Sequence, residues 1–297
     1  MLMTGSDLSW QKALLVTMGV AAGLGAALGL ELLRSRRRRK HKALWKYLTD
    51  AGRACKTGCV YLVGAGPASA DLMTLRAAHL LATATVVVTD DLVERDVLSF
   101  APEGCEIVHV GKRGGRDDST PQSDIDQLLV EKAREGHAVV RLKGGDPLVF
   151  GRVWSEIVSL RDANIPFEIV PGVSSVLSAP AAAVLPLTHK TKSKVVAVAS
   201  GHEVQSLDWT ALANGVIDTY VILMAGKTLP NICSFLLTNG RSEDTPVAVI
   251  HNAHREGQRR VVGTIKTIGG LTQTMKLSPA IVVIGDVAAL GTYDHLM

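Results

Sequence analysis

Cysteine is scarce in this chain, and its placement argues against a metal centre. The 297 residues contain four cysteines, at positions 55, 59, 105 and 233. None of them forms a CxxC pair, and their spacing to the histidines does not match a zinc site. The sequence therefore predicts reduced, unpaired thiols and no metal ligands, which is typical of a cytosolic or matrix-facing protein.

Most of the chain also lacks an excess of positive charge. The net charge is +4, but seven cations lie between Arg34 and Lys42, which leaves −3 for the remainder. A body without a basic surplus lacks the main electrostatic support for binding nucleic acid, so no nucleic-acid partner is expected. The apolar fraction of 47% excludes a mainly disordered chain, and the length allows two subdomains.

A complete dinucleotide-binding fingerprint is missing as well. Gly64 and Gly66 supply two of the three glycines, but the third position is Ser69, and Pro67 interrupts the start of the following helix. A nicotinamide enzyme is therefore disfavoured.

The N-terminus holds a long uncharged run. The eighteen residues from Ala13 to Leu30 carry no charge, and Leu32 and Leu33 extend the run past Glu31. As a helix, eighteen residues span roughly 27 Å, close to the thickness of a hydrocarbon core. The basic block follows at once, and positive residues stay on the cytoplasmic side. We expect a single-pass anchor over residues 13–33, with the catalytic body facing the cytosol.

Three other interpretations of this segment remain open. A cleaved signal peptide has basic residues before the apolar run, where this chain has Lys12 opposed by Asp7. A mitochondrial presequence is an arginine-rich amphipathic helix, and a buried globular helix would carry fewer glycines. The moderately apolar segment with its basic flank resembles mitochondrial outer-membrane signal anchors, although the sequence does not identify the membrane.

The sequence after the basic segment predicts an α/β fold. Short β-branched runs alternate with helical patterns, which is typical of a mainly parallel sheet covered by helices on both faces. Strands are expected at 60–63, 86–88, 107–110, 139–142 and 167–170, and helices at 72–82, 123–135 and 156–163. After residue 187 the pattern changes to longer strands with some antiparallel character, at 195–199, 219–224, 247–251, 259–264 and 280–284, with a helix at 228–239.

The twelve residues RLKGGDPLVFGR, from Arg141 to Arg152, carry the most information about function. Paired glycines after a buried strand let backbone amides approach a ligand closely. Asp146 adds one anionic acceptor among several cations. A site with one carboxylate and several fixed cations indicates two ligands of opposite character.

This string resembles the second signature of the uroporphyrinogen-III C-methyltransferases, which belong to the tetrapyrrole methylase family. The resemblance extends from about Val60 to the C-terminus. Its other motifs are VYLVGAGP at 60–67, LMTLRAAHLL at 72–81, DxLV at 90–93, GKRGG at 111–115, PGVSS at 171–175, LPLTHK at 185–190, SGH at 200–202 and SPAIVVIGDV at 278–287.

The resemblance implies two α/β subdomains of the tetrapyrrole methylase type, with the active site in the cleft between them and a homodimeric assembly. We expect the boundaries 1–57 for the anchor and basic linker, 58–187 for the first subdomain and 188–297 for the second. The implied reaction moves methyl groups from S-adenosylmethionine to carbons of uroporphyrinogen III and gives precorrin-2, the precursor of sirohaem and corrinoids. It needs no metal.

The resemblance also implies roles for individual residues. The proton acceptor falls on Asp90 and the proton donor on Lys112, and Arg152 is a further candidate for handling protons or binding carboxylates. The matched positions for the methyl donor are Pro67, Gly144, Gly145, Asp146, Val149, Ser174, Ser175, Met224 and Ala253. The substrate carries eight carboxylates, for which the expected clamps are Arg113, Arg141, Lys143 and Lys190.

The chain departs from the family pattern mainly on the substrate side. Ala68 replaces a glycine, Asp91 and Lys190 replace arginines, and Ser155 replaces the first of two paired glutamates. These changes leave two alternatives open beside the main hypothesis: a methylase acting on another tetrapyrrole or, less in keeping with the motifs, on a protein side chain, and a catalytically weakened scaffold that binds the methyl donor.

Overall fold

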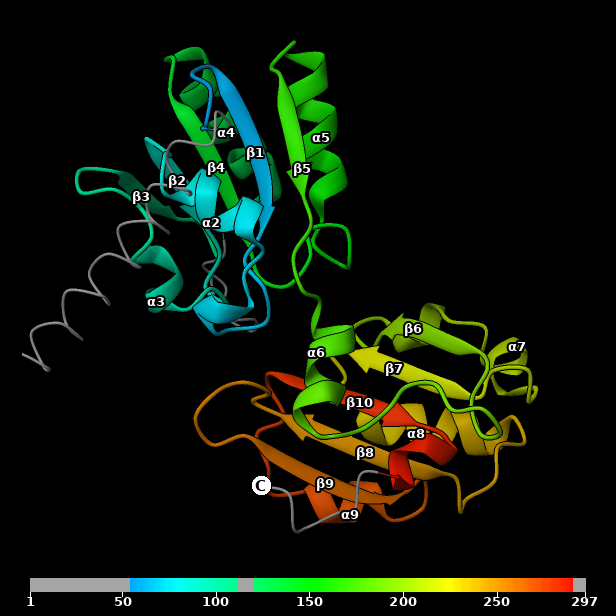
Figure 1. Ribbon diagram of the computed structural model, residues 1–297. Coiled ribbons are helices and arrows are strands. Elements are labelled where there is room, and N and C mark those ends of the chain that lie inside the picture. The colour runs from blue at the N-terminus through cyan, green and yellow to red at the C-terminus, as the bar shows by residue number, and fades with distance from the viewer. Residues whose placement is uncertain (1–53, 112–119, 291–297) are drawn as a thin grey trace, which may run out of the picture. The chain divides into compact units, whose positions relative to one another are not determined.

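The computed structural model describes residues 54–111 and 120–290 (Figure 1). The predicted membrane anchor at 13–33 lies outside these ranges. Within them, no helix combines the length and the apolar character that crossing a bilayer requires.

The first sheet is entirely parallel. It consists of β1 (Cys59–Gly64), β2 (Val86–Thr89), β3 (Glu106–His109), β4 (Ala138–Lys143) and β5 (Phe167–Val170), in the order β3-β2-β4-β1-β5. The central strands β1 and β4 are buried along their whole length, which explains why they read as nearly continuous apolar runs.

Helices cover both faces of this sheet, as the sequence predicts (Figure 1). Alternate residues of β1 point to opposite faces: Tyr61 and Val63 pack with α2 (Leu75–Leu81) and α3 (Arg95–Leu98). Val60 and Leu62 pack with α4 (Gln122–Arg134) and α5 (Val153–Asp162). The sheet is thus the middle layer of a three-layer unit.

The second sheet is mixed. It consists of β6 (Val196–Ser200), β7 (Thr219–Leu223), β8 (Pro246–His251), β9 (Arg259–Thr264) and β10 (Ala280–Ile284), in the order β6-β7-β10-β8-β9. The β6–β7 pair is parallel, and the other three pairs are antiparallel. This arrangement confirms the antiparallel character expected for the second half of the chain.

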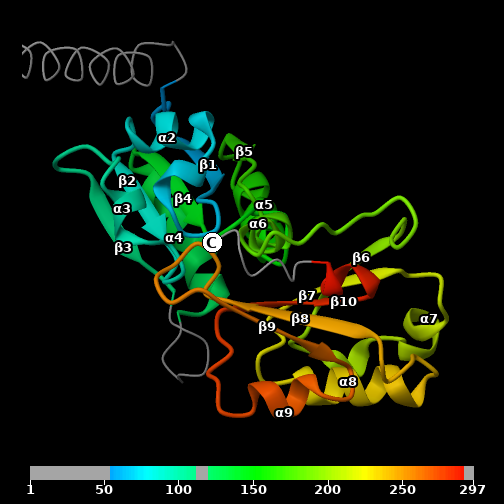
Figure 2. The ribbon, with the colours of Figure 1, turned by 60° about the horizontal axis from the view of Figure 1, so that its bottom comes forward.

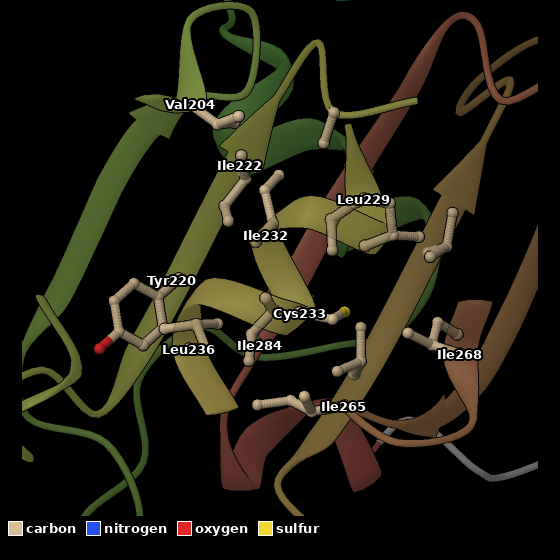
Figure 3. Close-up of a cluster of buried hydrophobic side chains, with 14 of the residues drawn as sticks. Val204, Tyr220, Ile222, Leu229, Ile232, Cys233, Leu236, Ile265, Ile268 and Ile284 are labelled. Carbon is tan, nitrogen blue, oxygen red and sulfur yellow. The ribbon is translucent and has the colours of Figure 1, made fainter. Parts of the chain in front are cut away.

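One face of the second sheet is covered by α7 (Trp209–Ala213), α8 (Leu229–Thr238) and α9 (Ile268–Thr272), and α8 and α9 lie on the same side of the strands in Figure 2. Figure 3 shows the resulting core, in which Ile232 and Leu236 of α8 meet Ile222 and Ile284 of the sheet. The opposite face packs on α6 (Ser175–Ala182).

Helix α6 is the main element that the sequence did not predict. It follows the PGVSS segment, and it contains Pro180. Ser174 caps its first turn, because the Ser174 hydroxyl accepts a hydrogen bond from the Val176 N–H. The eight-residue helix is too short and too uniformly apolar to show a helical period.

Candidate active site

The loops that carry the predicted site residues lie at one edge of the first sheet. The glycine segment Gly64–Pro67 begins at the last residue of β1. Asp90 follows β2, Gly144 follows β4 and Pro171 follows β5. Because all five strands are parallel, their carboxyl ends share this edge. Ligands of open parallel sheets bind outside the carboxyl ends of the strands, so the topology places these residues where a ligand site is expected.

Glycines lock three of these loops together. Gly66 and Gly145 exchange two backbone hydrogen bonds, with N···O distances of 3.2 and 2.8 Å. A Cβ atom added at Gly64 would lie 2.6 Å from the Gly145 carbonyl oxygen and from the Gly172 Cα. Side chains at these positions would force the three backbones apart, so the sequence requires glycine for their close approach.

Asp146 ties the same loops together through its carboxylate. Its Oδ1 accepts a hydrogen bond from the Leu148 N–H at 2.8 Å, and its Oδ2 accepts one from the Gly172 N–H at 3.0 Å. A carboxylate has about four acceptor positions, so each oxygen can still accept a hydrogen bond from a ligand hydroxyl. The predicted donor-binding residue is therefore also a structural link between the β4 and β5 loops.

The segment from Pro147 to Arg152 turns tightly and presents Arg152. Phe150 and Arg152 both adopt left-handed backbone conformations, with φ of 52° and 53°. Between them, a Cβ at Gly151 would lie 2.4 Å from the Pro147 carbonyl oxygen. Such conformations cost of order 1–3 kcal/mol each and persist only where the surroundings hold them, often at functional sites. Arg152 itself is exposed immediately before α5.

A buried ion-pair chain runs beneath this turn. Arg141 Nη2 lies 2.6 Å from Asp90 Oδ1, and Arg141 Nε lies 2.9 Å from Glu156 Oε1. The same Glu156 oxygen accepts a hydrogen bond from Lys143 Nζ at 2.7 Å. The family resemblance predicts Arg141 and Lys143 as clamps for substrate carboxylates, but their side chains are only 2% and 3% exposed and are paired inside the protein.

Burial and neighbouring charges shift the pKa values of Arg141 and Lys143, the two cations of the buried ion-pair chain, in opposite directions. Burial alone would lower the pKa of Arg141, but the carboxylates of Asp90 and Glu156 outweigh it, so that the pKa is raised. The pKa of Lys143 is lowered, first by burial and then by the neighbouring Arg141 cation. Glu156, which the sequence analysis gave no role, is the shared partner of both cations.

Further residues predicted to bind the methyl donor lie at one apolar cluster. Val149 and Ala253 both pack against the cluster that contains Val176 of α6 and Leu223 at the end of β7. The next residue, Met224, is half exposed and has a φ of 58°. Ser174 and Ser175 begin α6 beside this cluster. Backbone amides, hydroxyls, one carboxylate and an apolar lining together suit a nucleoside that carries a charged amino-acid tail.

The loop between β8 and β9 completes these contacts. His254 Nε2 lies 2.9 Å from the Ser178 carbonyl oxygen of α6. Arg255 donates a hydrogen bond to the Leu92 carbonyl oxygen at 2.8 Å and forms an ion pair with Glu94. The loop that carries Ala253 is thereby fastened both to α6 and to the segment after Asp90. No motif or spacing in the sequence indicates these long-range contacts.

The remaining predicted residues are placed as follows. Lys112 and Arg113 lie outside the described residues, whereas Gly111 packs closely on the backbone of Asp90. Lys190 is exposed in a turn closed by backbone hydrogen bonds between His189 and Ser193. Within residues 54–111 and 120–290, no group of three or more histidine, cysteine or acidic side chains could hold a metal ion.

Comparison with known proteins identifies the family and agrees with this fold. Residues 59–269 match the family model of the Tetrapyrrole (Corrin/Porphyrin) Methylases, and the chain belongs to this family. It is 44% identical over 239 residues to the S-adenosyl-L-methionine-dependent uroporphyrinogen III methyltransferase of Methanosarcina barkeri, covering 78% of this chain and 93% of that protein.

Two further relatives show how far the similarity extends. The chain is 42% identical to the siroheme synthase of Chromobacterium violaceum over 81% of its own length but spans only 52% of that longer protein. It also resembles the crystal structure of uroporphyrin-III C-methyl transferase from Thermus thermophilus complexed with S-adenyl homocysteine. That structure aligns with a TM-score of 0.67 and 38% identity, covering 78% of this chain and 99% of the other.

Proposed function

We propose that this chain is an S-adenosylmethionine-dependent C-methyltransferase that converts uroporphyrinogen III to precorrin-2. The observation that carries the proposal is the arrangement of the predicted donor positions. They lie on loops fastened by the Gly66–Gly145 hydrogen bonds, by the Asp146 carboxylate and by the apolar cluster around α6. Two relatives that align with this chain over nearly their whole length are named as uroporphyrinogen III methyltransferases.

The residues at this site suit the methyl donor. Asp146 can accept hydrogen bonds from ribose hydroxyls, and the ligand can approach the backbone of Gly144 and Gly145 closely because neither carries a side chain. The Gly145 N–H itself already donates to the Gly66 carbonyl oxygen. Val149 and Ala253 supply apolar surface for the base, and Met224 offers a polarisable thioether. When bound, the donor supplies an electrophilic methyl group on a sulfonium.

The chemistry left to the protein is orientation, charge balance and removal of one proton per methyl group. Asp90 is the proposed proton acceptor: its side chain is 29% exposed, and Arg141 occupies only its Oδ1. Lys112 is the proposed proton donor, since Gly111 lies against Asp90. Arg152, exposed just before α5, is proposed to bind a substrate carboxylate or to assist proton handling as a fixed cation.

The macrocycle carries eight carboxylates, so binding requires cations that solvent can reach. Arg152 and Lys190 are exposed and meet this requirement, and Arg113 is retained as a candidate from the sequence. Arg141 and Lys143 do not meet it in this structure, because both are buried. We therefore assign them to the interior of the site.

Three wider features are proposed from the sequence and the family resemblance: division of the body near residue 187, assembly as a homodimer and attachment to a bilayer through residues 13–33. The anchor would hold the catalytic body on the cytosolic side of its membrane. The last strand of the first sheet ends at Val170 and the first strand of the second begins at Val196, which supports a division between these residues.

The alternative is a related methylase acting on a different tetrapyrrole. The observation that favours it is the position of Ser155, which stands where a carboxylate is expected and faces Asp126 instead of a cation. The donor side of the site retains its matched residues under both hypotheses. Substrate selection by mass spectrometry separates the two.

The test uses the full chain in detergent, with S-adenosylmethionine and uroporphyrinogen III under anaerobic conditions. We expect a product heavier by two methyl groups, and Asp90→Asn should reduce its rate by about 10²–10⁴-fold, as for loss of a general base. Titration calorimetry measures donor binding independently. Donor binding by wild type without any methylated tetrapyrrole would contradict the proposed substrate, and no donor binding would contradict the whole proposal.

A further inference from the structure

The buried ion-pair chain ends on the proposed proton acceptor. It comprises two acids and two cations, Asp90, Glu156, Arg141 and Lys143, and its net charge is zero when all four are ionised. Three of the four side chains are at most 3% exposed, and only Asp90 reaches the solvent-accessible edge of the sheet. We infer that Arg141 is a positioning residue that orients the Asp90 carboxylate, and that Glu156 holds Arg141 in place.

The guanidinium of Arg141 is fixed at three points. Its Nη2 donates to Asp90 Oδ1 at 2.6 Å, its Nε donates to Glu156 Oε1 at 2.9 Å, and its Nη1 lies 3.3 Å from the Val88 carbonyl oxygen. A planar guanidinium presents these donors in a rigid fork, so fixing two of them sets the direction of the third. The direction in which Asp90 is held therefore depends on Glu156, which does not touch Asp90.

The same buried ion-pair chain also supports the turn that presents Arg152. Glu156 lies in the first turn of α5, four residues after Arg152. A Cβ atom at Gly151 would lie 3.3 Å from Lys143 Cε, which places the Lys143 side chain against this turn. One buried carboxylate thus connects the supports of two proposed catalytic residues that lie on loops after different strands, Asp90 after β2 and Arg152 after β4.

The energetic cost of this arrangement also indicates a function. Removing two cations and Glu156 from water is expensive, and replacing such a group with apolar side chains is often neutral or stabilising. Glu156 Oε2 has no hydrogen-bond partner among the described residues, so the carboxylate is not placed for maximal stability. The feature that the network does provide is a fixed carboxylate at Asp90.

This inference rests on the proposed role of Asp90, and Arg141→Lys tests it. A lysine keeps the charge balance, but one ammonium cannot reproduce the fork between Asp90 and Glu156. We expect kcat to fall by about 10²-fold, as for a misplaced catalytic group. The KM for the tetrapyrrole and the Kd for S-adenosylmethionine should stay within about twofold, because the buried Arg141 side chain is assigned to the interior of the site and not to either ligand. A direct clamp would instead raise KM.

Arg76→Lys is the matched control. Arg76 forms an analogous two-point pair with Glu168, with distances of 2.9 and 2.6 Å, on the α2 side of the sheet. Its kcat should remain at the wild-type value. If Arg141→Lys does not fold, the double variant Arg141→Gln/Glu156→Gln removes one charge of each sign and should show the same loss of kcat with unchanged donor affinity.

A crystal structure of Arg141→Lys decides the inference independently of turnover. We expect the Asp90 carboxylate to be rotated or disordered, and an unchanged carboxylate would overturn the inference even if the wild type proved inactive on uroporphyrinogen III. Unchanged kcat in Arg141→Lys, with Asp90→Asn strongly impaired, would also overturn it. Full activity of Asp90→Asn would refute the proposed role of Asp90 itself and thereby remove the basis for a positioning partner.

Discussion

Gly172 packs directly on Gly64, so that a Cβ atom added to Gly172 would lie 2.8 Å from the Gly64 Cα and 2.1 Å from the Gly145 carbonyl oxygen. Both contacts are with backbone atoms, which cannot rotate away as a flexible side chain can. The ends of β1, β4 and β5 are therefore held together by the absence of side chains.

Gly172→Ala should consequently lower the free energy of unfolding by about 1–3 kcal/mol, the usual cost of overpacking. It should also weaken S-adenosylmethionine binding by calorimetry, since the Gly172 N–H holds Asp146. Gly269→Ala is the control, because a Cβ there meets nothing within 4 Å. Donor binding should remain unchanged, and the free energy of unfolding should not fall, since alanine in helix α9 is favoured over glycine by roughly 0.5–1 kcal/mol. Equal effects of the two substitutions would contradict the proposed locking role.

How much of this arrangement the sequence can predict depends on what kind of contact makes it. Strands such as β1 and β4 were located correctly because complete burial selects short runs of mainly apolar residues, here CVYLVG and the start of AVVRLK. Helix α6 was missed because its apolar residues and Pro180 carry no period. The loops were correctly expected to hold glycines, but which glycine touches which strand is decided by the order of strands in the sheet.

The same distinction applies to the charged residues. A sequence shows that Arg141 is cationic but does not show whether it faces solvent, and its motif suggested a substrate clamp. Its partner Glu156 lies 15 positions away, and no motif or spacing in the sequence predicts their pairing. Pairing between a strand and the next helix depends on which residues of each face inward, which the spacing alone did not reveal.

A second prediction concerns Ala68, which replaces a family glycine. Ala68 is 4% exposed and has a φ of 156°, a conformation that residues with a Cβ rarely adopt. Ala68→Gly should raise the thermal midpoint, because the relief of about 1–3 kcal/mol of strain exceeds the entropic cost of glycine, about 0.4–1 kcal/mol. Scanning calorimetry measures the change.

Ala82→Gly provides the comparison for this substitution. Ala82 is also buried, but its φ of −67° is ordinary, so glycine should destabilise the protein there. A lowered midpoint in both variants would show that Ala68 is not strained.

A third prediction concerns stability at alkaline pH. The Cys55 thiol donates a hydrogen bond to the Leu80 carbonyl oxygen at 3.3 Å, and burial raises its pKa from 9.0 to about 12. The folded state therefore keeps a proton that the unfolded state loses above pH 9. The stability that this thiol contributes is complete below pH 9 and declines as the pH rises towards 12.

Cys55→Ala should thus lose less unfolding free energy between pH 8 and pH 11 than the wild type, as measured by urea titration. Cys55→Ser should behave likewise, because serine keeps a donor for Leu80 but does not titrate in this range. Lys143 acts in the opposite direction just below pH 10.5, because its pKa is lowered, so the difference between variant and wild type is the informative quantity. Parallel pH profiles of all three proteins would refute the assignment.

The last prediction concerns Ser155, which stands where the family has a glutamate. The Ser155 hydroxyl lies 3.5 Å from Oδ1 of Asp126, and Asp126 is 7% exposed and accepts a hydrogen bond from Gln122 at 2.8 Å. Restoring glutamate would place a second carboxylate beside a buried one, and like charges in a poorly hydrated position repel strongly. Ser155→Glu alone should therefore lower stability by about 1 kcal/mol or more and should not improve turnover.

The double variant Ser155→Glu/Asp126→Asn removes this repulsion while keeping a group that can accept the Gln122 hydrogen bond. We expect it to recover the stability lost in the single variant. It should also raise kcat on uroporphyrinogen III above the wild-type value, because the new glutamate then supplies the missing carboxylate without repulsion from a buried aspartate. Asp126→Asn alone controls for the loss of the aspartate. Recovery of stability without any gain in kcat would show that the serine is not a catalytic deficit and would favour a different tetrapyrrole as the substrate.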